Sequence, residues 1–412
     1  MRKQLLLGST ALIVAALAAP DFVSAEEPLR LKVRGFKHDF FGIGDVDVDG
    51  FDYNNTGEFS DGEIQFRGET ALDNGLTIGV QVELETDARG DQIDENYIFI
   101  KGDFGKIVMG SENNSNYNTF WGVTAPGVGV PINSGWVTVF VPPPDGHQLS
   151  FRSTITTTNI DVGNDENAIS YYSPRFSGFQ FTAAYAPTVV DSGEGKTFTG
   201  FQANEATEYS NAWGVGFNFS ESFNGVDIAV AAGYNQIEEP DNVSALGGDS
   251  VQQFKVGANI SVGGFSVGGS YANEFEGKII VTGADADGDA AAAFATVVGA
   301  GGTFAAAQAA GIAAGLAAGD SVNRSEEGQS YDAGVSYSTG PWGVSVTYFH
   351  GEWEATTSIS GDDEMDAIVG GVSYALGPGI TASGSILYGN LEDEGGAEGK
   401  ATMGIIGLTV NF

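Results

Sequence analysis

Apolar and polar side chains alternate along this chain in segment after segment, from residue 29 to the last residue. Residues 209–220 read YSNAWGVGFNFS, and residues 342–348 read WGVSVTY. Successive side chains of a β-strand point to opposite faces, so each such segment has one apolar face and one polar or small face. This alternation predicts an all-β chain.

The alternating segments predict sixteen strands. Most of them approximate the roughly 9–11 residues that a tilted strand needs to cross a bilayer. We expect the strands at 29–43, 62–72, 76–87, 92–101, 105–112, 167–176, 179–186, 208–220, 226–237, 251–262, 265–276, 329–338, 342–354, 364–376, 379–391 and 400–412.

The connections between these strands are sorted by length. Short connections hold turn-forming residues, such as Asp73-Asn74-Gly75 and Gly340-Pro341, and they alternate with long polar stretches. A soluble β-sandwich has no reason to sort its loops in this way. The pattern predicts a sixteen-stranded antiparallel transmembrane β-barrel with short periplasmic turns and long extracellular loops. The long stretches are 44–61, 113–166, 187–207, 238–250, 277–328, 355–363 and 392–399.

The first 25 residues have the features of a secretory signal peptide. Arg2 and Lys3 precede an apolar stretch, and small residues stand at the expected positions before a cleavage site after Ala25. We therefore expect residues 1–25 to be removed and residues 26–412 to form the barrel.

The charge of the chain excludes several functions. Its 17 Lys and Arg residues against 54 Asp and Glu residues give a net charge of -37, which argues against nucleic-acid binding and favours cations as partners. The absence of cysteine excludes thiolate chemistry. His38, His147 and His350 are far apart, and no nucleophile or phosphate-loop motif occurs. The sequence predicts no enzyme.

Strict alternation assigns charged side chains to the interior of the barrel. A Lys or Arg facing lipid at mid-depth costs about 2–4 kcal/mol, so charged positions are expected to face the lumen. Basic residues beside carboxylates could create a transverse field at a constriction, or they could be ordinary wetted wall residues; the sequence leaves both interpretations open. The expected pore-lining residues are Arg30, Lys32, Arg34, Glu63, Arg67, Glu69, Glu83 and Lys255.

Two long loops have unusual compositions. Residues 113–166 contain Trp121, Trp136 and Phe140, and a loop of this length with apolar residues is expected to fold into the lumen and pack on its wall. Residues 277–328 are rich in Ala and Gly, and 290–319 carry no charge. We expect a low-complexity loop there, with a small helix over the pore mouth as the alternative.

Two acidic stretches resemble calcium-binding loops, since alternating aspartates before a glycine can converge oxygen ligands on a hard cation. The first lacks the acidic residue expected at its twelfth position, where Thr56 stands. Solvated acidic loops are the alternative, and no other cofactor is expected. The candidate ligands are Asp45, Asp47 and Asp49, or Asp285, Asp287 and Asp289.

Four stretches of the chain together resemble the Gram-negative trimeric general porins, most closely their alphaproteobacterial branch. Leu31–Phe36 is similar to the first strand of that family, Gly102–Gly110 to a turn and its fifth strand, and Asn167–Phe179 to its sixth strand. The terminal Asn411-Phe412 is similar to the signal that the barrel-insertion machinery reads. The resemblance covers nearly the whole chain after residue 25. The third loop departs from the family because it is rich in Trp, Val and Pro rather than acids, and the sixth is unusually long.

The resemblance implies a homotrimer in the outer membrane of a Gram-negative bacterium, with a water-filled channel narrowed by an inward-folded third loop. Function is then passive diffusion of small hydrophilic solutes and ions, and the net charge favours cations. Two alternatives remain at this point: a secreted soluble β-rich binding or adhesion protein, and a substrate-specific channel.

Overall fold

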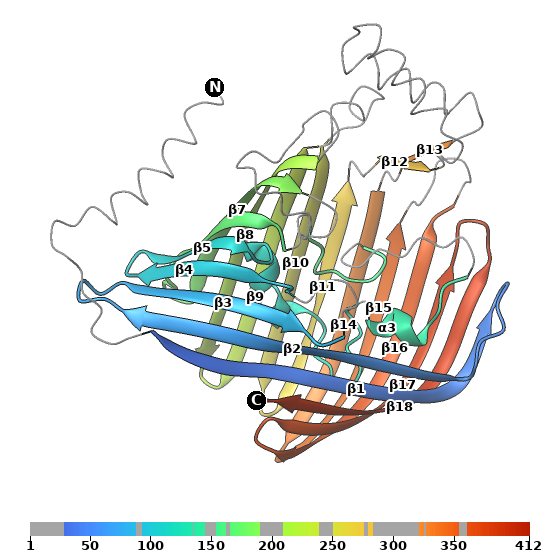
Figure 1. Ribbon diagram of the computed structural model, residues 1–412. Helices are drawn as coiled ribbons and strands as arrows, with labels where there is room; N and C mark the ends of the chain where they lie inside the picture. Colours follow the sequence, from blue (N-terminus) through green and yellow to red (C-terminus); the bar gives the residue numbers. More distant parts are fainter. Residues whose placement is uncertain are drawn as a thin grey trace, which may run out of the picture.

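The structure, a computed structural model, describes residues 29–87, 93–134, 136–144, 154–161, 165–189, 209–238, 250–275, 279–282, 321–324, 327–353 and 361–412. Sixteen antiparallel strands close into one barrel, and each strand pairs with its neighbours in the chain, apart from β11, which pairs with β14. The first and last strands complete the ring, with Phe36 opposite Asn411 and Val48 opposite Gly399. Figure 1 shows the closed wall. The expected fold is confirmed.

The barrel strands follow the alternating segments of the sequence closely. Their bounds are β1 Arg30–Val48, β2 Thr56–Ala71, β3 Thr77–Glu85, β4 Asn96–Gly102, β5 Gly105–Ser111, β6 Asn167–Tyr172, β7 Phe179–Val189, β8 Tyr209–Phe223, β9 Val226–Glu238, β10 Val251–Val262, β11 Phe265–Phe275, β14 Glu327–Thr339, β15 Trp342–Trp353, β16 Asp363–Gly377, β17 Ile380–Glu392 and β18 Glu398–Asn411.

Several strand ends were placed wrongly from the sequence: β4 begins at Asn96 rather than 92, β6 ends at Tyr172 rather than 176, and the largest errors are at β1 and β2. We expected a loop over 44–61, whereas β1 continues to Val48 and β2 already begins at Thr56. The period of two in fact continues through this acidic stretch: Val46 and Val48 alternate with Asp45 and Asp47, and the strand still pairs with β18. Acidic side chains can occupy one face of a strand that extends beyond the bilayer, so their presence did not mark a loop.

The long sixth connection contains a short two-stranded sheet. β12 (Ile279–Thr282) pairs with β13 (Ser321–Arg324) outside the barrel. Most of the Ala- and Gly-rich stretch, with the helix considered for 290–319, lies outside the described residues, as does the expected signal peptide.

The strands differ in length around the barrel. β4, β5 and β6 have 7, 7 and 6 residues, whereas the barrel strands from β8 to β18, which exclude β12 and β13, have 11 to 15. We call β2–β6 the short wall, after its short members β4, β5 and β6, and β8–β18 the tall wall; the cyan strands β4 and β5 and the long yellow to red strands of Figure 1 show the contrast. Strands of 6 or 7 residues fall below the length of about 9–11 that crosses a bilayer.

The outward face of the barrel is apolar. Leu31, Val33 and Ile43 on β1 are 62%, 55% and 62% exposed, and Ile386 and Ile406 on the tall wall are 70% and 68% exposed. Such an apolar band is what a barrel presents to lipid hydrocarbon. Among the described residues, no helix has the length and apolar character needed to cross a membrane.

Residues 113–134, 136–144 and 154–161 of the third connection run inside the barrel, against the inner face of the tall wall. They contain the short helices α2 (Ser115–Asn118), η1 (Trp121–Val123) and α3 (Trp136–Phe140). Phe140 and Val141 are 2% and 0% exposed and share a buried cluster with inward residues of β1 and β15–β18, such as Phe40 and Met403. This internal packing gives the barrel a large buried apolar cluster on the tall-wall side, in addition to a smaller one on β4–β6.

Candidate functional site

The inner face of β1–β5 is lined by charged side chains. The register places Lys32 opposite Arg67, Arg67 opposite Gln81, and Gln81 opposite Tyr97 across four neighbouring strands. Every second residue on these strands shares that face, and the residues between them point outward. Arg30, Lys32, Arg34, Glu63, Arg67, Glu69 and Glu83 therefore all project inward.

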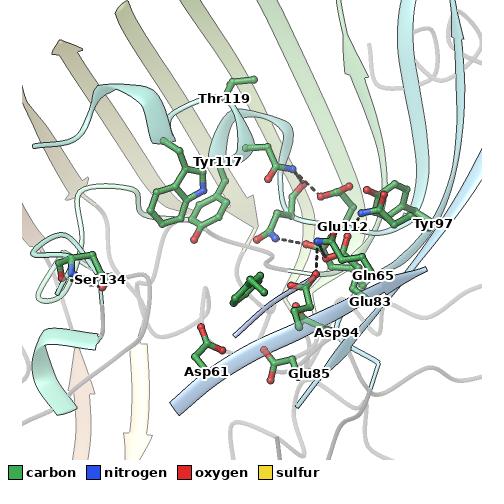
Figure 2. A pocket seen from close by; sticks show the side chains of 18 of the residues that line it. Asp61, Gln65, Glu83, Glu85, Asp94, Tyr97, Glu112, Tyr117, Thr119 and Ser134 are labelled. Carbon is green, nitrogen blue, oxygen red and sulfur yellow. Dashed lines mark hydrogen bonds between the residues drawn. The ribbon is translucent and has the colours of Figure 1, made fainter. Parts of the chain in front are cut away.

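A cavity of about 1020 Å³ lies between the short wall and the third loop. Figure 2 shows its two sides: carboxylates such as Asp61, Glu85 and Asp94 stand across from Tyr117 and Ser134 of the third loop. Among the described residues, Lys106 is the one Lys or Arg that lines it. Its acidic lining residues, which we call the acidic wall, are Asp61, Glu63, Glu83, Glu85, Asp87, Asp94, Glu95 and Glu112.

The acidic wall has a buried part and a wetted part. Glu83, Glu95 and Glu112 are 4%, 5% and 6% exposed. Amide side chains donate hydrogen bonds to these buried carboxylates: Gln65 Nε2 lies 3.0 Å from Glu83 Oε2, and Asn118 Nδ2 lies 2.9 Å from Glu112 Oε1. Buried polar groups need such partners.

Asp61, Glu85 and Asp94 form the wetted part, since Glu85 is exposed and the other two are half-buried. Carboxylates in contact with water keep their charge at neutral pH. These three residues therefore supply a negative potential where a solute would pass.

The third loop supplies an aromatic surface to the same cavity. Tyr117 and Trp121 pack edge to face, with ring centroids 5.4 Å apart and an interplanar angle of 84°. Tyr117 is buried, whereas Trp121 is 49% exposed and lines the cavity. The loop thus presents rings and hydroxyls rather than charges to the acidic wall.

Hydrogen bonds from Ala125, Val128 and Asn133 fix the third loop to the tall wall. Asp332 of β14 is 4% exposed and accepts hydrogen bonds from Ala125 N at 3.1 Å, from Asn133 Nδ2 and from Ser270 Oγ at 2.8 Å. Val128 N donates to Ser345 Oγ of β15 at 2.9 Å. A buried carboxylate with several donors holds its partners in place.

Lys255 of β10 does not line the channel in the way we expected. It projects inward, but it is only 1% exposed because the third loop covers it. Its Nζ donates to Asn159 Oδ1 at 2.7 Å and to Ile160 O at 2.9 Å, and it lies 5.4 Å from the ring centroid of Tyr117. Alternation correctly gave its direction but could not reveal that a loop buries it. Lys255 is a second residue that fixes the third loop.

The inward basic residues lie beside the acidic wall on the same face of the barrel, nearer the short turns. Arg34 Nη2 and Arg67 Nη1 donate to one atom, Gln81 Oε1, at 3.1 and 2.9 Å. Glu69 forms ion pairs with Lys32, Arg67 and Lys101 at 4.0, 3.3 and 3.7 Å. Basic and acidic groups are therefore stacked along the channel.

The first calcium candidate occupies a strand and its end. Asp45 and Asp47 belong to β1, opposite Thr402 and Lys400, and Asp49 Oδ2 accepts a hydrogen bond from Glu398 N at 3.0 Å. Within the described part of the chain, no group of three His, Asp or Glu side chains is arranged to hold a metal ion. Asp285, Asp287 and Asp289 lie outside the described residues.

Sequence reasoning missed several members of the site. Asp61 was assigned to a loop, whereas it lies in β2, and the contributions of Asp94, Glu95 and Glu112 were not foreseen. Glu95 and Glu112 flank β4 and β5 at their long-loop ends. A signal was available for these two, because each stands one residue beyond a strand whose inward positions continue to it.

Comparison with known proteins agrees with this architecture. The family model described as "Gram-negative porin" matches residues 9–394. No curated protein sequence matches the chain.

Several solved structures have a similar fold. Salmonella typhi OmpF, solved in complex with daunomycin, has a TM-score of 0.59 at 15% identity, covering 95% of this chain and 100% of OmpF. The anion-selective porin of Comamonas acidovorans has a TM-score of 0.54 at 14% identity, covering 93% and 100%. Vibrio cholerae OmpT, an outer-membrane protein, has a TM-score of 0.53 at 12% identity, covering 95% and 100%. At sequence identities of 15%, 14% and 12%, the similarity to these structures shows a shared fold only.

Proposed function

The chain belongs to the Gram-negative porin family and is an outer-membrane porin, and we propose that its channel passes small hydrophilic solutes and ions by diffusion, with a preference for cations. The alternative of a secreted soluble β-rich protein is wrong, because family and fold are those of an outer-membrane channel. The proposal includes no catalytic role.

The observation that carries the cation preference is the acidic wall. Eight carboxylates and a single basic residue line the cavity among the described residues. The third loop contributes no compensating cation, since its described cavity-lining side chains include Tyr117, Trp121 and Asn133. A cation in this cavity is attracted by the wetted carboxylates, and an anion is repelled.

Most of these charges act through water, so salt should weaken their effect. The Debye length is about 10 Å at 0.1 M and about 3 Å at 1 M salt. We therefore expect cation preference to be strongest in dilute salt. The fold similarity to an anion-selective porin does not bear on this sign, because selectivity depends on lining residues rather than on the barrel.

The experiment is a planar-bilayer recording of the purified protein. Stepwise conductance is expected, with a reversal potential of cation-selective sign under a KCl gradient around 0.1 M that shrinks around 1 M. A protein that gives no conductance steps would refute the channel, and anion selectivity in dilute salt would refute the preference. A saturable current for one solute would instead favour the substrate-specific alternative.

We further propose a homotrimer whose subunits meet at the outward face of β1–β5. Three observations support this face: β4 and β5 are short, the outward positions of β1–β5 hold no Tyr or Trp, and β1 carries charges there. Lys37 Nζ pairs with Asp87 at 2.6 Å, and Asp39 accepts from Ser60 Oγ at 2.7 Å.

Each of these features is unfavourable against lipid. Tyr and Trp mark the headgroup level of barrels, and outward Tyr234, Tyr271, Tyr348 and Tyr388 do so on the tall wall. Covering the outward face of β1–β5 with another copy of the chain would remove its charges from hydrocarbon.

Three further proposals rest on the sequence pattern of the first 25 residues and on the family resemblance. Residues 1–25 are a cleaved signal peptide, Phe412 is read by the insertion machinery, and outer-membrane lipid surrounds the trimer. Calcium binding by the acidic loops also stays a prediction.

A further inference from the structure

The inner face of β1–β5 changes sign along the channel. Near the short turns stand Lys106, which lies opposite Lys101, and five further cations that we call the basic cluster: Arg30, Lys32, Arg34, Arg67 and Lys101. Toward the long loops, the same strands carry the acidic wall. From the long-loop side to the short-turn side, the inward residues change from Glu63 to Arg67 on β2 and from Glu83 to Gln81 on β3. Along β4 they change from Glu95, which immediately precedes the strand, to Lys101.

The members of the basic cluster are close neighbours. Lys32 and Arg67 are directly opposite across β1 and β2, which brings their Cβ atoms to about 5 Å in an antiparallel pair. The guanidinium of Arg67 and the ammonium of Lys101 lie over the same ring, at 4.4 and 4.6 Å from the centroid of Phe99. Like charges held this closely repel one another unless an anion lies between them.

Glu69 occupies the position of such an anion. Its two carboxylate oxygens take the ion pairs from Lys32, Arg67 and Lys101. Glu69 is a single carboxylate shared by three cations, and Lys32 and Lys101 remain 69% and 39% exposed. The site is therefore open and carries excess positive charge.

We propose that the basic cluster is a binding site for multivalent oxyanions, such as solutes bearing several phosphate or carboxylate groups, that enter from the short-turn end of the channel. Planar guanidinium groups match the paired oxygens of phosphate and carboxylate, and the ammonium groups add point charge. Glu69 is an internal competitor for the same cations. The acidic wall repels these anions from the long-loop end, so access is one-sided.

This inference rests on the proposed channel function but is separable from it. A protein that conducts, yet binds no oxyanion at this end, would keep the channel and lose only the site. The channel's cation preference and this site are compatible, because they belong to different levels of the same wall.

The test uses inorganic tripolyphosphate as a blocker of single-channel current. Since the chain has no cysteine, a single Asn74→Cys substitution in the β2–β3 turn identifies the short-turn side by its reaction with an impermeant thiol reagent. Tripolyphosphate added on that side should reduce the current at a concentration at least about tenfold lower than on the other side.

Two variants move the block in opposite directions. Glu69→Gln removes the competitor and should lower the blocking concentration several-fold. The double variant Lys32→Gln, Lys101→Gln should raise it about tenfold, because two exposed charges are lost. Lys400→Gln, a basic residue on β18 far from the cluster, is the matched control and should leave block unchanged.

Equal block from both sides would overturn the proposal, and so would block that neither Glu69→Gln nor the double variant alters. The Glu69→Gln result guards against a double variant that fails to fold, because it is a predicted gain rather than a loss.

Discussion

The short wall and the tall wall of this barrel divide the functions of a channel between them. On the tall wall, the inner face is covered by the third loop, and the outer face carries the tyrosines that mark a membrane boundary. On the short wall, the inner face is open to the cavity and holds the carboxylates, while the outward positions of β2–β5 lack Tyr and Trp. The tall wall thus anchors the third loop, and the short wall supplies the charges that face the cavity.

This comparison teaches where the charges of a barrel can be concentrated. Two buried charges of the tall wall bind the third loop: Lys255 donates hydrogen bonds to it, and Asp332 accepts hydrogen bonds from it. The short wall keeps Glu85 exposed and Asp61 half-buried beside the cavity. Buried, partnered charges position the loop, whereas wetted charges act on solutes.

The largest expected effect comes from lysine substitutions at outward positions of the two walls. Ile98→Lys on the short wall and Ile386→Lys on the tall wall each place a cation at an exposed outward position, 50% and 70% exposed. A lysine at mid-depth in lipid costs about 2–4 kcal/mol. We expect Ile386→Lys to lower the thermal stability of an intact trimer and Ile98→Lys to dissociate the trimer.

Native gel mobility and heat-modifiable migration separate these outcomes. If Ile98→Lys behaves like Ile386→Lys and leaves the oligomer intact, the short wall faces lipid and the assignment of the interface is incorrect.

A smaller effect is expected at the anchors of the third loop. Asp332→Ala leaves Ala125 N, the Asn133 amide and Ser270 with lost partners, at about 1–3 kcal/mol for an unsatisfied buried group. The cost should fall on the loop rather than on the barrel strands. Proteolytic cleavage between residues 121 and 141 should accelerate about tenfold or more, with noisier single-channel current.

Asp366→Ala, at an outward position on β16, is the matched control for the anchor experiment.

Deletion of residues 121–140 removes the part of the third loop that packs on the tall wall and should raise single-channel conductance. Conductance unaffected by the deletion would mean that the third loop does not narrow the channel.

The smallest effect concerns Glu394, which lies between β17 and β18 at the long-loop end. Burial, followed by the adjacent Asp363 carboxyl, raises the pKa of Glu394 to about 7. A carboxyl with a raised pKa in the folded state stabilises the fold less as pH rises from its ordinary value, near 4.5, through about 7.

Glu394→Gln should therefore stabilise the protein at pH 8 and leave it unchanged at pH 4. Solvent screening keeps the gain to about 1 kcal/mol or less. Thermal unfolding at the two pH values checks it; equal shifts at both would show that ionisation of Glu394 is not the cause.

The sequence predicted the barrel well because one physical rule governs all of it. A period of two sets both the strand and the direction of each side chain, so the inward positions of Arg30, Lys32, Arg67 and Glu83 followed from parity. The rule has no equivalent for the third loop, whose path depends on contacts between residues more than a hundred positions apart, such as Asn133 and Asp332.

The errors have the same origin. Lys255 was expected to contact water because alternation gives the direction of a side chain. Alternation does not show whether another segment covers that side chain, and the third loop covers Lys255. Glu95 and Glu112 join the cavity because β4 and β5 are short, which brings their ends to the level of the acidic wall. Alternation would have given the inward direction of Glu95 and Glu112, but strand length, which sets their level in the barrel, was missing.

The central claim is that the wetted carboxylates of the short wall make the channel prefer cations. The direct measurement is the reversal potential under a KCl gradient around 0.1 M for the unmodified protein and for the triple variant Asp61→Asn, Glu85→Gln, Asp94→Asn, with Glu364→Gln, Glu392→Gln, Glu398→Gln on the outer surface as control. We predict cation selectivity for the unmodified protein and the control, and a reversal potential near zero or of anion-selective sign for the triple variant. The same reversal potential in all three proteins would contradict the account.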